Sequence, residues 1–359
     1  MKKIIMTGGG TAGHVTPNIA LFPYLEEAGF KIEYIGSYDG IERTLIEDQN
    51  IPYYGIDSGK LRRYMDIKNF TDPFHILHGF MEAKKILKRV KPDIVFSKGG
   101  FVAVPVIFAA RSLKIPVVIH ESDLTPGLAN KLAIPKADVV CYNFPETKKY
   151  VPAEKSVHTG LPVRSELKDG NPHRGYSFCG FREDKPLLMV IGGSLGSANI
   201  NENVRKALPE LLKTFNIAHI CGEGKMDEYT MDVKGYRQFE YVSEELPDLF
   251  AASNLIISRA GANVICEIAF LKKPSILIPL GTDQSRGDQI LNAKSFKRRG
   301  FAEVLLEENL TPASLYKTVM KVYKNEQEII DTLTASKEAN ASELVTKVIL
   351  KTVKKHKRK

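Results

Sequence analysis

A short apolar run that ends in a glycine-rich turn occurs twice in this chain, about half a chain apart. The first copy is residues 2–14 (KKIIMTGGGTAGH) and the second is residues 187–197 (LLMVIGGSLGS). Each reads as a buried strand, a tight turn and the start of a helix, which is the repeating unit of a parallel α/β sheet. Two such starts predict two Rossmann-like domains, with ligand chemistry in the cleft between them.

Length and composition also favour two domains in a globular protein. The chain has 359 residues, more than a single hydrophobic core usually supports. Its 43% hydrophobic and 26% charged residues are ordinary, and its apolar runs are too short to span a bilayer. Four scattered cysteines, and a first strand with no signal peptide before it, favour a reducing cytoplasm. The net charge of +9 favours acidic partners.

Strand-like runs alternate with amphipathic stretches along both halves. The predicted strands are residues 3–7, 32–35, 94–97, 117–120 and 139–141, then 187–191, 218–221, 238–241, 255–258 and 275–278. The predicted helices include residues 18–28, 41–48 and 76–90, then 199–214, 262–270 and 288–299. This alternation predicts an α/β fold with parallel sheets. We expect an N-terminal domain over residues 1–162, a C-terminal domain over residues 163–335, and a helix within residues 336–359 that packs back toward the N-terminal domain.

The first turn carries the pattern Gly8-x-Gly10-x-x-Gly13, in which backbone N–H groups and a helix N-terminus can approach a phosphate. An NAD site also needs an acidic residue at the end of the second strand. The predicted strand ends in residues 35–37 (IGS), none of which is acidic, so the sequence disfavours NAD binding. His14 follows the last glycine, and an ordinary histidine pKa of roughly 6.5 suits a general base. The alternative is a histidine that only packs the turn.

Two further turns follow strands in the first half. Residues 97–105 (SKGGFVAVP) could cradle a second phosphate-bearing ligand or form only a tight turn. Residues 120–130 (HESDLTPGLAN) direct polar side chains toward the same cleft. His120 and Glu121 could ligate a metal, but no third ligand has a suitable spacing, so no metal site is predicted.

Two turns in the second half suit a nucleotide sugar. Residues 258–267 (SRAGANVICE) read as a strand, a turn of small residues and a helix N-terminus, which favours a diphosphate. Glu267 could accept hydrogen bonds from two ribose hydroxyls, or could act only on the helix dipole. Residues 281–289 (GTDQSRGDQ) follow the next strand and offer amide and carboxylate groups to sugar hydroxyls.

An apolar helix edge flanked by cations is predicted between residues 70 and 89. Its apolar members include Phe74, Leu77 and Phe80, and its neighbouring cations include Lys84 and Lys85. This pattern is typical of an interfacial helix, although core packing alone would also explain the apolar residues. We therefore expect peripheral contact with a membrane.

Seven motifs occur in a fixed order between residue 1 and about residue 293. They are GGTAGH at 9–14, GGFV at 99–102, HE at 120–121, PVR at 162–164, GGSLG at 192–196, RAGA at 259–262 and QxxNA at 289–293. Together they resemble the MurG family of bacterial glycosyltransferases. The resemblance implies the GT-B fold, in which the parallel sheets of two Rossmann-like domains face a central cleft. It also implies inverting transfer of N-acetylglucosamine from UDP-GlcNAc to the muramyl 4-hydroxyl of lipid I, which gives lipid II for peptidoglycan.

The resemblance implies donor contacts in both halves of the chain. They are Thr11, Ala12, Gly13, Asp123, Arg164, Ser194, Val242 through its backbone, Ala262, Asn263, Val264, Ile265, Cys266, Glu267 and Gln289. Asp123 stands where the family often has Asn, and residues 262–267 lack a hydroxyl that the family has near the phosphates. The backbone at Gly10, Gly13, Gly99 and Gly100 is implied to face the diphosphate of the acceptor.

The implied mechanism is a single displacement with His14 as the general base. The helix that begins at Ala262, the loop at Ser194 and Arg164 would stabilise the leaving diphosphate, with no metal and no cofactor. The implied partners are UDP-GlcNAc, lipid I and an anionic inner-leaflet surface, and proteins of cell-wall synthesis are compatible further partners. The protein would then be peripheral, on the cytoplasmic side of the cell membrane.

Two other functions remain compatible with the sequence. Another GT-B enzyme, such as a lipid-linked sugar transferase or a nucleotide-sugar epimerase, could share Glu267 and the glycine turns. A non-catalytic nucleotide-binding or nucleic-acid-binding protein is suggested by the charge of +9. No nucleic-acid motif or interleaving of aromatic and basic residues supports the second function, so nucleic acid is not expected as a partner.

Overall fold

The computed structural model describes residues 1–59, 72–193, 196–282, 286–336 and 340–358. The chain divides into two compact units. The first unit combines Met1–Arg164 with Asn340–Lys359, and the second is Ser165–Ala339. The first unit is therefore built from two separate pieces of the sequence, while the second is continuous.

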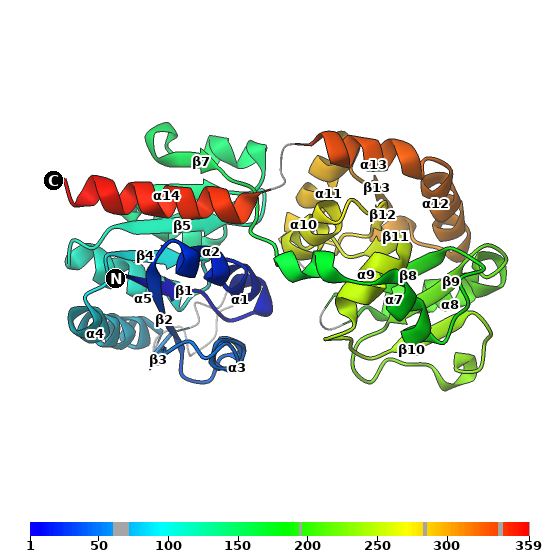
Figure 1. Cartoon of the computed structure of the whole chain (residues 1–359), viewed down its shortest axis with the longest axis horizontal. Helices are drawn as coiled ribbons and strands as arrows, with labels where there is room; N and C mark the ends of the chain where they lie inside the picture. Colours follow the sequence, from blue (N-terminus) through cyan, green and yellow to red (C-terminus); the bar gives the residue numbers. More distant parts are fainter. Residues whose placement is uncertain (60–71, 194–195, 283–285, 337–339, 359) are drawn as a thin grey trace. The chain divides into compact units, whose positions relative to one another are not determined.

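A parallel sheet forms the centre of the first unit (Figure 1). Its described strands lie in the order β3-β2-β1-β4-β5-β6-β7. They are β1 (Lys2–Thr7), β2 (Phe30–Ser37), β3 (Tyr53–Ile56), β4 (Ile94–Ser97), β5 (Val117–Glu121), β6 (Val139–Tyr142) and β7 (Ser156–His158). The helices of this unit are α1 (Ala12–Ile19), α2 (Phe22–Glu27), α3 (Ile41–Glu47), α4 (Asp72–Val90), α5 (Ala103–Ser112), α6 (Leu128–Ala133) and α14 (Ala341–His356).

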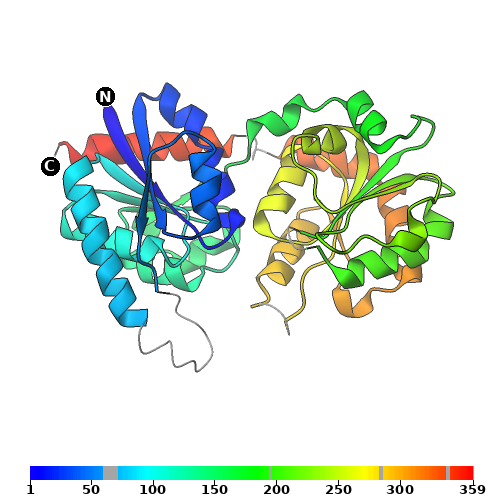
Figure 2. The ribbon, with the colours of Figure 1, turned by 90° about the horizontal axis from the view of Figure 1, so that it is seen from below.

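Alternate residues of the inner strands β1, β4 and β5 enter two hydrophobic cores, one on each face of the first sheet. Ile5 belongs to a core that includes residues of α4 and α5, whereas Ile4 and Met6 belong to one that includes residues of α1, α2 and α14. This follows from the two-residue period of a strand. The C-terminal helix α14 contacts α2, β4 and β6, and both ribbon views show it against this sheet (Figures 1 and 2).

The second unit repeats the same plan. Its described strands are parallel and lie in the order β10-β9-β8-β11-β12-β13. They are β8 (Leu187–Ile191), β9 (Asn216–Ile220), β10 (Tyr236–Phe239), β11 (Ser253–Ser258), β12 (Ser275–Leu277) and β13 (Glu303–Val304). The helices are α7 (Pro172–Cys179), α8 (Ala198–Leu211), α9 (Leu246–Ala252), α10 (Ala262–Phe270), α11 (Asp288–Arg298), α12 (Pro312–Lys324) and α13 (Glu326–Ala335). The predicted α/β fold with two Rossmann-like parallel sheets is confirmed.

The strand order reverses direction once in each sheet. In the first unit the reversal lies between the neighbouring strands β1 and β4, and in the second it lies between β8 and β11. Open α/β sheets bind ligands at this switch point, beyond the carboxyl ends of the strands. Both copies of the glycine-rich turn follow a strand at a switch point, which makes these two edges the candidate sites.

The elements differ from the predicted ones in two ways. The helix expected over residues 18–28 is instead two short helices, α1 and α2, and the first of them begins directly after the glycine turn. Three short strands, β3, β7 and β13, were not predicted. Each lies at or next to an edge of its sheet, where partial exposure weakens the apolar pattern. In the part of the chain that the structure describes, no helix combines the length and apolar character needed to cross a membrane.

Candidate active site

Two glycine loops meet at the switch point of the first unit. The first glycine loop, residues 8–11, follows β1, and the second glycine loop, residues 98–102, follows β4, whose last residue pairs with that of β1. Gly100 has a positive φ of 84°, and a Cβ there would collide with the Gly9 carbonyl oxygen. Because no other residue fits this approach without strain, the sequence GG at 99–100 is what allows the loops to touch.

His14 is the third residue of α1, which begins directly after the first glycine loop. Its Nδ1 lies 3.2 Å from the Thr11 hydroxyl oxygen, and its backbone N–H donates to the Thr11 carbonyl. Its own carbonyl accepts a hydrogen bond from the buried Asn18 side chain. The His14 ring is partly exposed, and Thr11 and Gly13 beside it are exposed. The predicted base therefore stands at the surface of the switch point on a fixed stretch of backbone.

A buried carboxylate, Glu42, supports the first glycine loop, and sequence reasoning missed it. Glu42 lies in the first turn of α3 and is fully buried. Its Oε2 accepts a hydrogen bond of 3.1 Å from the Gly10 N–H. The Gly10 amide is thus directed inward, to Glu42, which differs from the expectation that Gly10 faces the acceptor diphosphate.

A buried lysine, Lys98, stands at the base of the second glycine loop. Its side chain is 1% exposed, and its ammonium donates to His120 Nδ1 at 2.8 Å and to the Ser122 hydroxyl at 2.7 Å. His120 Nε2 in turn donates to the Gly160 carbonyl. Burial, and then the charge of Lys98, hold the pKa of His120 well below its usual value, so His120 is a neutral imidazole. Because its pKa is lowered and both ring nitrogens are hydrogen-bonded, His120 is a weak base.

The loop after β5 braces Gly99 from the other side. Glu121 is buried and accepts hydrogen bonds from the Asp123 and Gly127 N–H groups and from the Asn130 side chain. Burial and the neighbouring Asp123 raise the pKa of Glu121 to about 7. A Cβ at Gly99 would lie 3.3 Å from the Asn130 side-chain oxygen. Asp123 is partly exposed in this loop, and its predicted sugar contact stays a prediction.

The switch point of the second unit carries a third glycine loop, residues 192–197, after β8. Ser194, a predicted donor contact, lies outside the described residues of this loop. A Cβ at Gly196 would collide with the Cys221 carbonyl oxygen, so the loop packs directly on the end of β9. Ser197 then caps α8 by accepting a hydrogen bond from the Ile200 N–H. The turn predicted to approach a phosphate therefore ends at a helix N-terminus.

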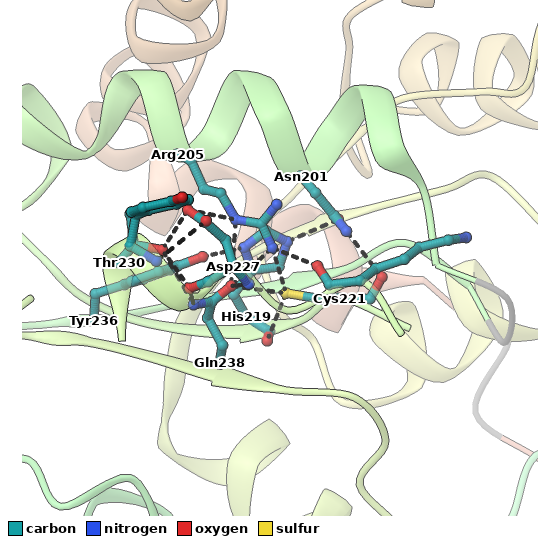
Figure 3. Close-up of polar contacts among 10 residues, drawn as sticks. Asn201, Arg205, His219, Cys221, Asp227, Thr230, Tyr236 and Gln238 are labelled. Carbon is teal, nitrogen blue, oxygen red and sulfur yellow. Dashed lines mark hydrogen bonds and ion pairs between the residues drawn. The ribbon is translucent and has the colours of Figure 1, made fainter. Parts of the chain in front are cut away.

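A buried polar network fixes the end of β9 beneath this loop (Figure 3). His219 lies 2.8 Å from the Tyr236 hydroxyl and 3.0 Å from the Asn201 side-chain oxygen, and Asn201 donates to the Cys221 carbonyl. Burial lowers the pKa of His219 to about 3, so this ring is neutral and structural. Arg205 donates to Gln238 and to the Lys225 carbonyl. The network holds the strand end on which Gly196 rests.

Arg259 joins the third glycine loop to the rest of the second switch point. Its guanidinium donates to the Ser197 hydroxyl at 2.8 Å and forms two hydrogen bonds with Glu307, of 2.7 and 2.9 Å. Burial alone would raise the pKa of Glu307, but hydrogen bonds from Arg259 bring it below its usual value. Sequence reasoning gave Arg259 only a place in a motif. Its buried, bidentate pairing shows that it positions the loop.

The helix α10 exposes only part of the predicted 262–267 segment. Ala262 and Ile265 are buried, so neither side chain is presented to a ligand. The remaining four residues of the segment, Asn263, Val264, Cys266 and Glu267, are partly exposed. An amphipathic helix against a sheet must bury one face, which explains the division.

Gln289 also has a structural task that the sequence did not indicate. It lies on α11, and its side-chain oxygen accepts hydrogen bonds from the Ala260 and Leu280 N–H groups. It therefore joins the loops after β11 and β12. Val242 is buried, and its predicted backbone contact with the donor stays a prediction. Arg164 is partly exposed and is the last residue of the Met1–Arg164 piece of the first unit.

The exposed apolar edge on α4 differs from the predicted one in one residue. Phe74, Leu77 and Met81 are 75, 60 and 57% exposed. Phe80 is instead half-buried against the core of the first unit, because it lies about 60° around the helix from Leu77, toward the side that carries the core residues Ala83 and Leu87. The Lys84 ammonium lies over its ring. Within the described residues, no three His, Cys, Asp or Glu side chains gather as a metal site would require.

Comparisons with known proteins agree with this architecture. Residues 4–142 match the N-terminal domain of glycosyltransferase family 28, and residues 187–349 match its C-terminal domain. A relative from Lachnospira eligens is 57% identical over 97% of this chain and 99% of its own length. A relative from Clostridium botulinum is 58% identical over 99% of this chain and all of its own length.

Both relatives carry the name UDP-N-acetylglucosamine–N-acetylmuramyl-(pentapeptide) pyrophosphoryl-undecaprenol N-acetylglucosamine transferase. The crystal structure of Acinetobacter baumannii MurG is 29% identical in sequence and matches this structure with a TM-score of 0.78. That match covers 98% of this chain and all of the other. The chain therefore belongs to glycosyltransferase family 28 and, within it, to the MurG family of N-acetylglucosamine transferases.

Proposed function

We propose that this protein transfers N-acetylglucosamine from UDP-GlcNAc to the muramyl 4-hydroxyl of lipid I and so makes lipid II. The observation that carries the proposal is identity of 57–58% over nearly the whole chain to relatives named as that transferase. Glycine loops at both switch points support it, because the reaction needs two phosphate-bearing substrates.

The second unit is the proposed donor site. Backbone N–H groups at the start of α10 and in the third glycine loop, together with Arg164 of the first unit, would stabilise the charge that grows on the leaving UDP. Glu267, partly exposed on α10, would accept hydrogen bonds from the ribose hydroxyls. Asn263, Val264, Cys266 and the side-chain N–H₂ of Gln289 would complete the contacts, with Thr11, Ala12, Gly13 and Asp123 contributed by the first unit. No protein-bound metal is proposed, so transfer should persist in EDTA.

His14 is the proposed general base. If Nδ1–H donates to the Thr11 hydroxyl, which lies 3.2 Å away, Nε2 is the basic nitrogen. In the displacement the 4-hydroxyl oxygen attacks the anomeric carbon, the bond from that carbon to the UDP oxygen breaks, and the hydroxyl proton passes to His14. The inversion of configuration follows from attack on the face opposite to the leaving group. General base catalysis of this kind contributes about 10²–10⁴-fold.

The α4 edge is the proposed contact with the membrane that holds the lipid acceptor. Phe74, Leu77 and Met81 are exposed apolar residues, and Lys85 and Lys88 are exposed on the same helix. Such an edge would enter the interface while its lysines attract anionic headgroups of the inner leaflet. Replacing Leu77 with Ser should weaken flotation with anionic vesicles, while Phe80→Leu should not. Unchanged flotation of the Leu77 variant would contradict this contact.

The deciding experiment follows release of UDP from UDP-GlcNAc, with and without a soluble lipid I analogue. Release should require the acceptor, which separates this function from an epimerase and from a non-catalytic nucleotide-binding protein. His14→Ala should lower kcat at least about 100-fold with little change in the KM for UDP-GlcNAc. Glu267→Ala should instead raise that KM. Normal turnover and pH dependence in the His14 variant would show that another group is the base.

A further inference from the structure

We propose that Glu42 is the positioning residue for His14, because its buried carboxylate anchors the first glycine loop and so sets where α1 begins. Glu42 is absent from the motifs that resemble the MurG family and from the residues expected to touch substrate. The inference rests on the proposed role of His14 as the base.

The first observation is how the Glu42 carboxylate is bound. Its Oε1 accepts hydrogen bonds from the Ser37 N–H at 3.0 Å and from the Ser37 hydroxyl at 2.5 Å. Its Oε2 accepts the Gly10 N–H, 32 positions away in the sequence. Each oxygen therefore holds a different segment, and one of them is the first glycine loop. A fully buried carboxylate is costly unless it is bound in this way.

The second observation is the space that the chain reserves for this side chain. A Cβ at Gly9 or at Gly40 would collide with the Glu42 carboxylate, and one at Gly36 would lie 2.8 Å from its Cγ. Gly40 and Gly36 are outside the phosphate-binding pattern of the first turn, so phosphate binding does not explain why these positions are glycine. Gly9 and Gly40, from different segments, thus leave the space that the Glu42 carboxylate occupies, while a Cβ at Gly36 would first collide with the Tyr53 hydroxyl.

The third observation connects the anchor to His14. Gly10 has a φ of 84°, which places it in the left-handed region, and the next residue, Thr11, is the N-cap of α1. Thr11 in turn contacts His14 through its hydroxyl and through its carbonyl. The hydrogen bond from Gly10 to Glu42 therefore fixes the residue that precedes the cap and, through it, the place of the imidazole. A shift of about 1 Å at a catalytic group can cost about 100-fold in rate.

Glu42→Gln tests the anchor with little change in volume. The Gln oxygen would stay with the two Ser37 donors, so its N–H₂ would face the Gly10 N–H, donor against donor. We expect kcat to fall about 10- to 100-fold and the KM for UDP-GlcNAc to stay within about threefold. Amide exchange at Gly10 should accelerate. Gly40→Ala, which pushes the carboxylate aside without removing it, should lower kcat in the same way and serves if the Gln variant does not fold.

Two control variants separate this role from general loss of stability. Glu33→Gln removes another buried carboxylate of the same unit, one that accepts from the Tyr54 hydroxyl and does not touch the loop. Ser37→Ala removes one hydrogen bond to Glu42 but leaves the Gly10 contact. Both should keep kcat within about threefold of the wild type. A loss of kcat in Glu33→Gln equal to that in Glu42→Gln would overturn the proposal.

A double-mutant cycle with His14→Ala gives the decisive result. If Glu42 acts through His14, Glu42→Gln should cost at least tenfold in the wild type but less than about threefold when His14 is already Ala. An equal loss in both backgrounds, or unchanged kcat when Gly10 exchange is accelerated, would overturn the proposal. Failure of the proposed function has a different signature, namely wild-type protein that releases no UDP with acceptor, or His14→Ala with normal turnover.

Discussion

The two glycine loops of the first unit look alike in sequence and touch one another, but they rest on opposite charges. The first loop is held from beneath by the carboxylate of Glu42, through the Gly10 amide. The second begins at the buried ammonium of Lys98, which contacts His120 and Ser122. A carboxylate under a loop disfavours a bound anion, while a cation favours one. From this comparison we expect the first loop to place the His14 side chain and the second loop to hold a phosphate, because the buried charges beneath them have opposite signs.

The largest expected effect comes from substituting the glycine where the two loops meet. Gly10 and Gly100 share a φ of 84°, but a Cβ at Gly100 would collide with the Gly9 carbonyl oxygen, whereas one at Gly10 would meet nothing within 4 Å. Gly100→Ala should therefore lower the free energy of unfolding by about 3 kcal/mol, against about 1 kcal/mol for Gly10→Ala. Thermal and denaturant unfolding would measure both. Equal losses would mean that the contact between the loops is unimportant.

The next effect is a pH dependence that arises near the second loop. Burial and the charge of Lys98 keep the pKa of His120 well below its usual value of roughly 6.5. At pH 5 the unfolded chain therefore binds a proton at His120 that the folded protein does not, and stability falls as the pH drops below about 6.5. This costs about 2 kcal/mol at pH 5 relative to pH 7.

His120→Gln isolates that share of the pH dependence. The Gln oxygen can accept from Lys98 and its N–H₂ can donate to the Gly160 carbonyl, as the neutral imidazole does. The fall in unfolding free energy between pH 7 and pH 5 should be about 2 kcal/mol smaller in this variant than in the wild type. The same fall in both proteins would show that His120 is protonated in the folded state.

A third prediction concerns substrate affinity. If the second loop holds the diphosphate of the acceptor, Lys98→Met should raise the KM for a lipid I analogue five- to tenfold, about 1.4 kcal/mol at most. The KM for UDP-GlcNAc should change less, because the proposed donor site lies in the second unit. Glu42→Gln should show the reverse pattern, a loss in kcat with little change in either KM. Initial rates at varied acceptor concentration would test this. If Lys98→Met lowered only kcat, the two loops would not differ in the way proposed.

The smallest effect is expected from Tyr34→Phe. The Tyr34 hydroxyl donates to the Gly8 carbonyl at 2.7 Å and accepts from Asn18, both buried beneath the first loop. Its loss should cost about 1 kcal/mol of unfolding free energy, because two buried groups lose a partner. The effect on kcat should be under threefold, since the Gly10 anchor remains. A larger loss of kcat would show that the position of His14 depends on the hydrogen bond at Gly8 rather than on the one at Gly10.

The sequence predicted the strands that carry the site to within about two residues. β1 and β8 are apolar runs followed directly by glycine, β4 is an apolar run followed by Lys98 and two glycines, and this signal is local. The motif residues, from His14 to Gln289, were found because they follow such strands. The role of each of these residues depends on contacts that are distant in sequence. Gln289, expected to contact a sugar, also joins two loop backbones, and Ile265 proved to be a core residue.

The charges beneath the loops could not be predicted from the sequence. No sequence pattern around Glu42 or Lys98 indicates that the side chain is buried, and charged residues are usually exposed. Their burial depends on contacts that are distant in sequence, Glu42 with Gly10 and Lys98 with His120 and Ser122. The one available signal was Gly40, two positions before Glu42. Its meaning becomes clear only when the carboxylate occupies the space that this glycine leaves.

The C-terminal helix α14 has a consequence for how the protein is made. Val345, Ile349 and Val353 of α14 complete the core that contains Ile4 and Met6 of the first strand. During vectorial synthesis the ribosome produces the whole second unit before residues 341–356 emerge. The second unit, which is continuous in sequence, can therefore complete its core first, while one face of the first unit's sheet stays incompletely covered until residues 341–356 emerge. The N-terminal part of the nascent chain is thus the part that depends longest on protection from aggregation.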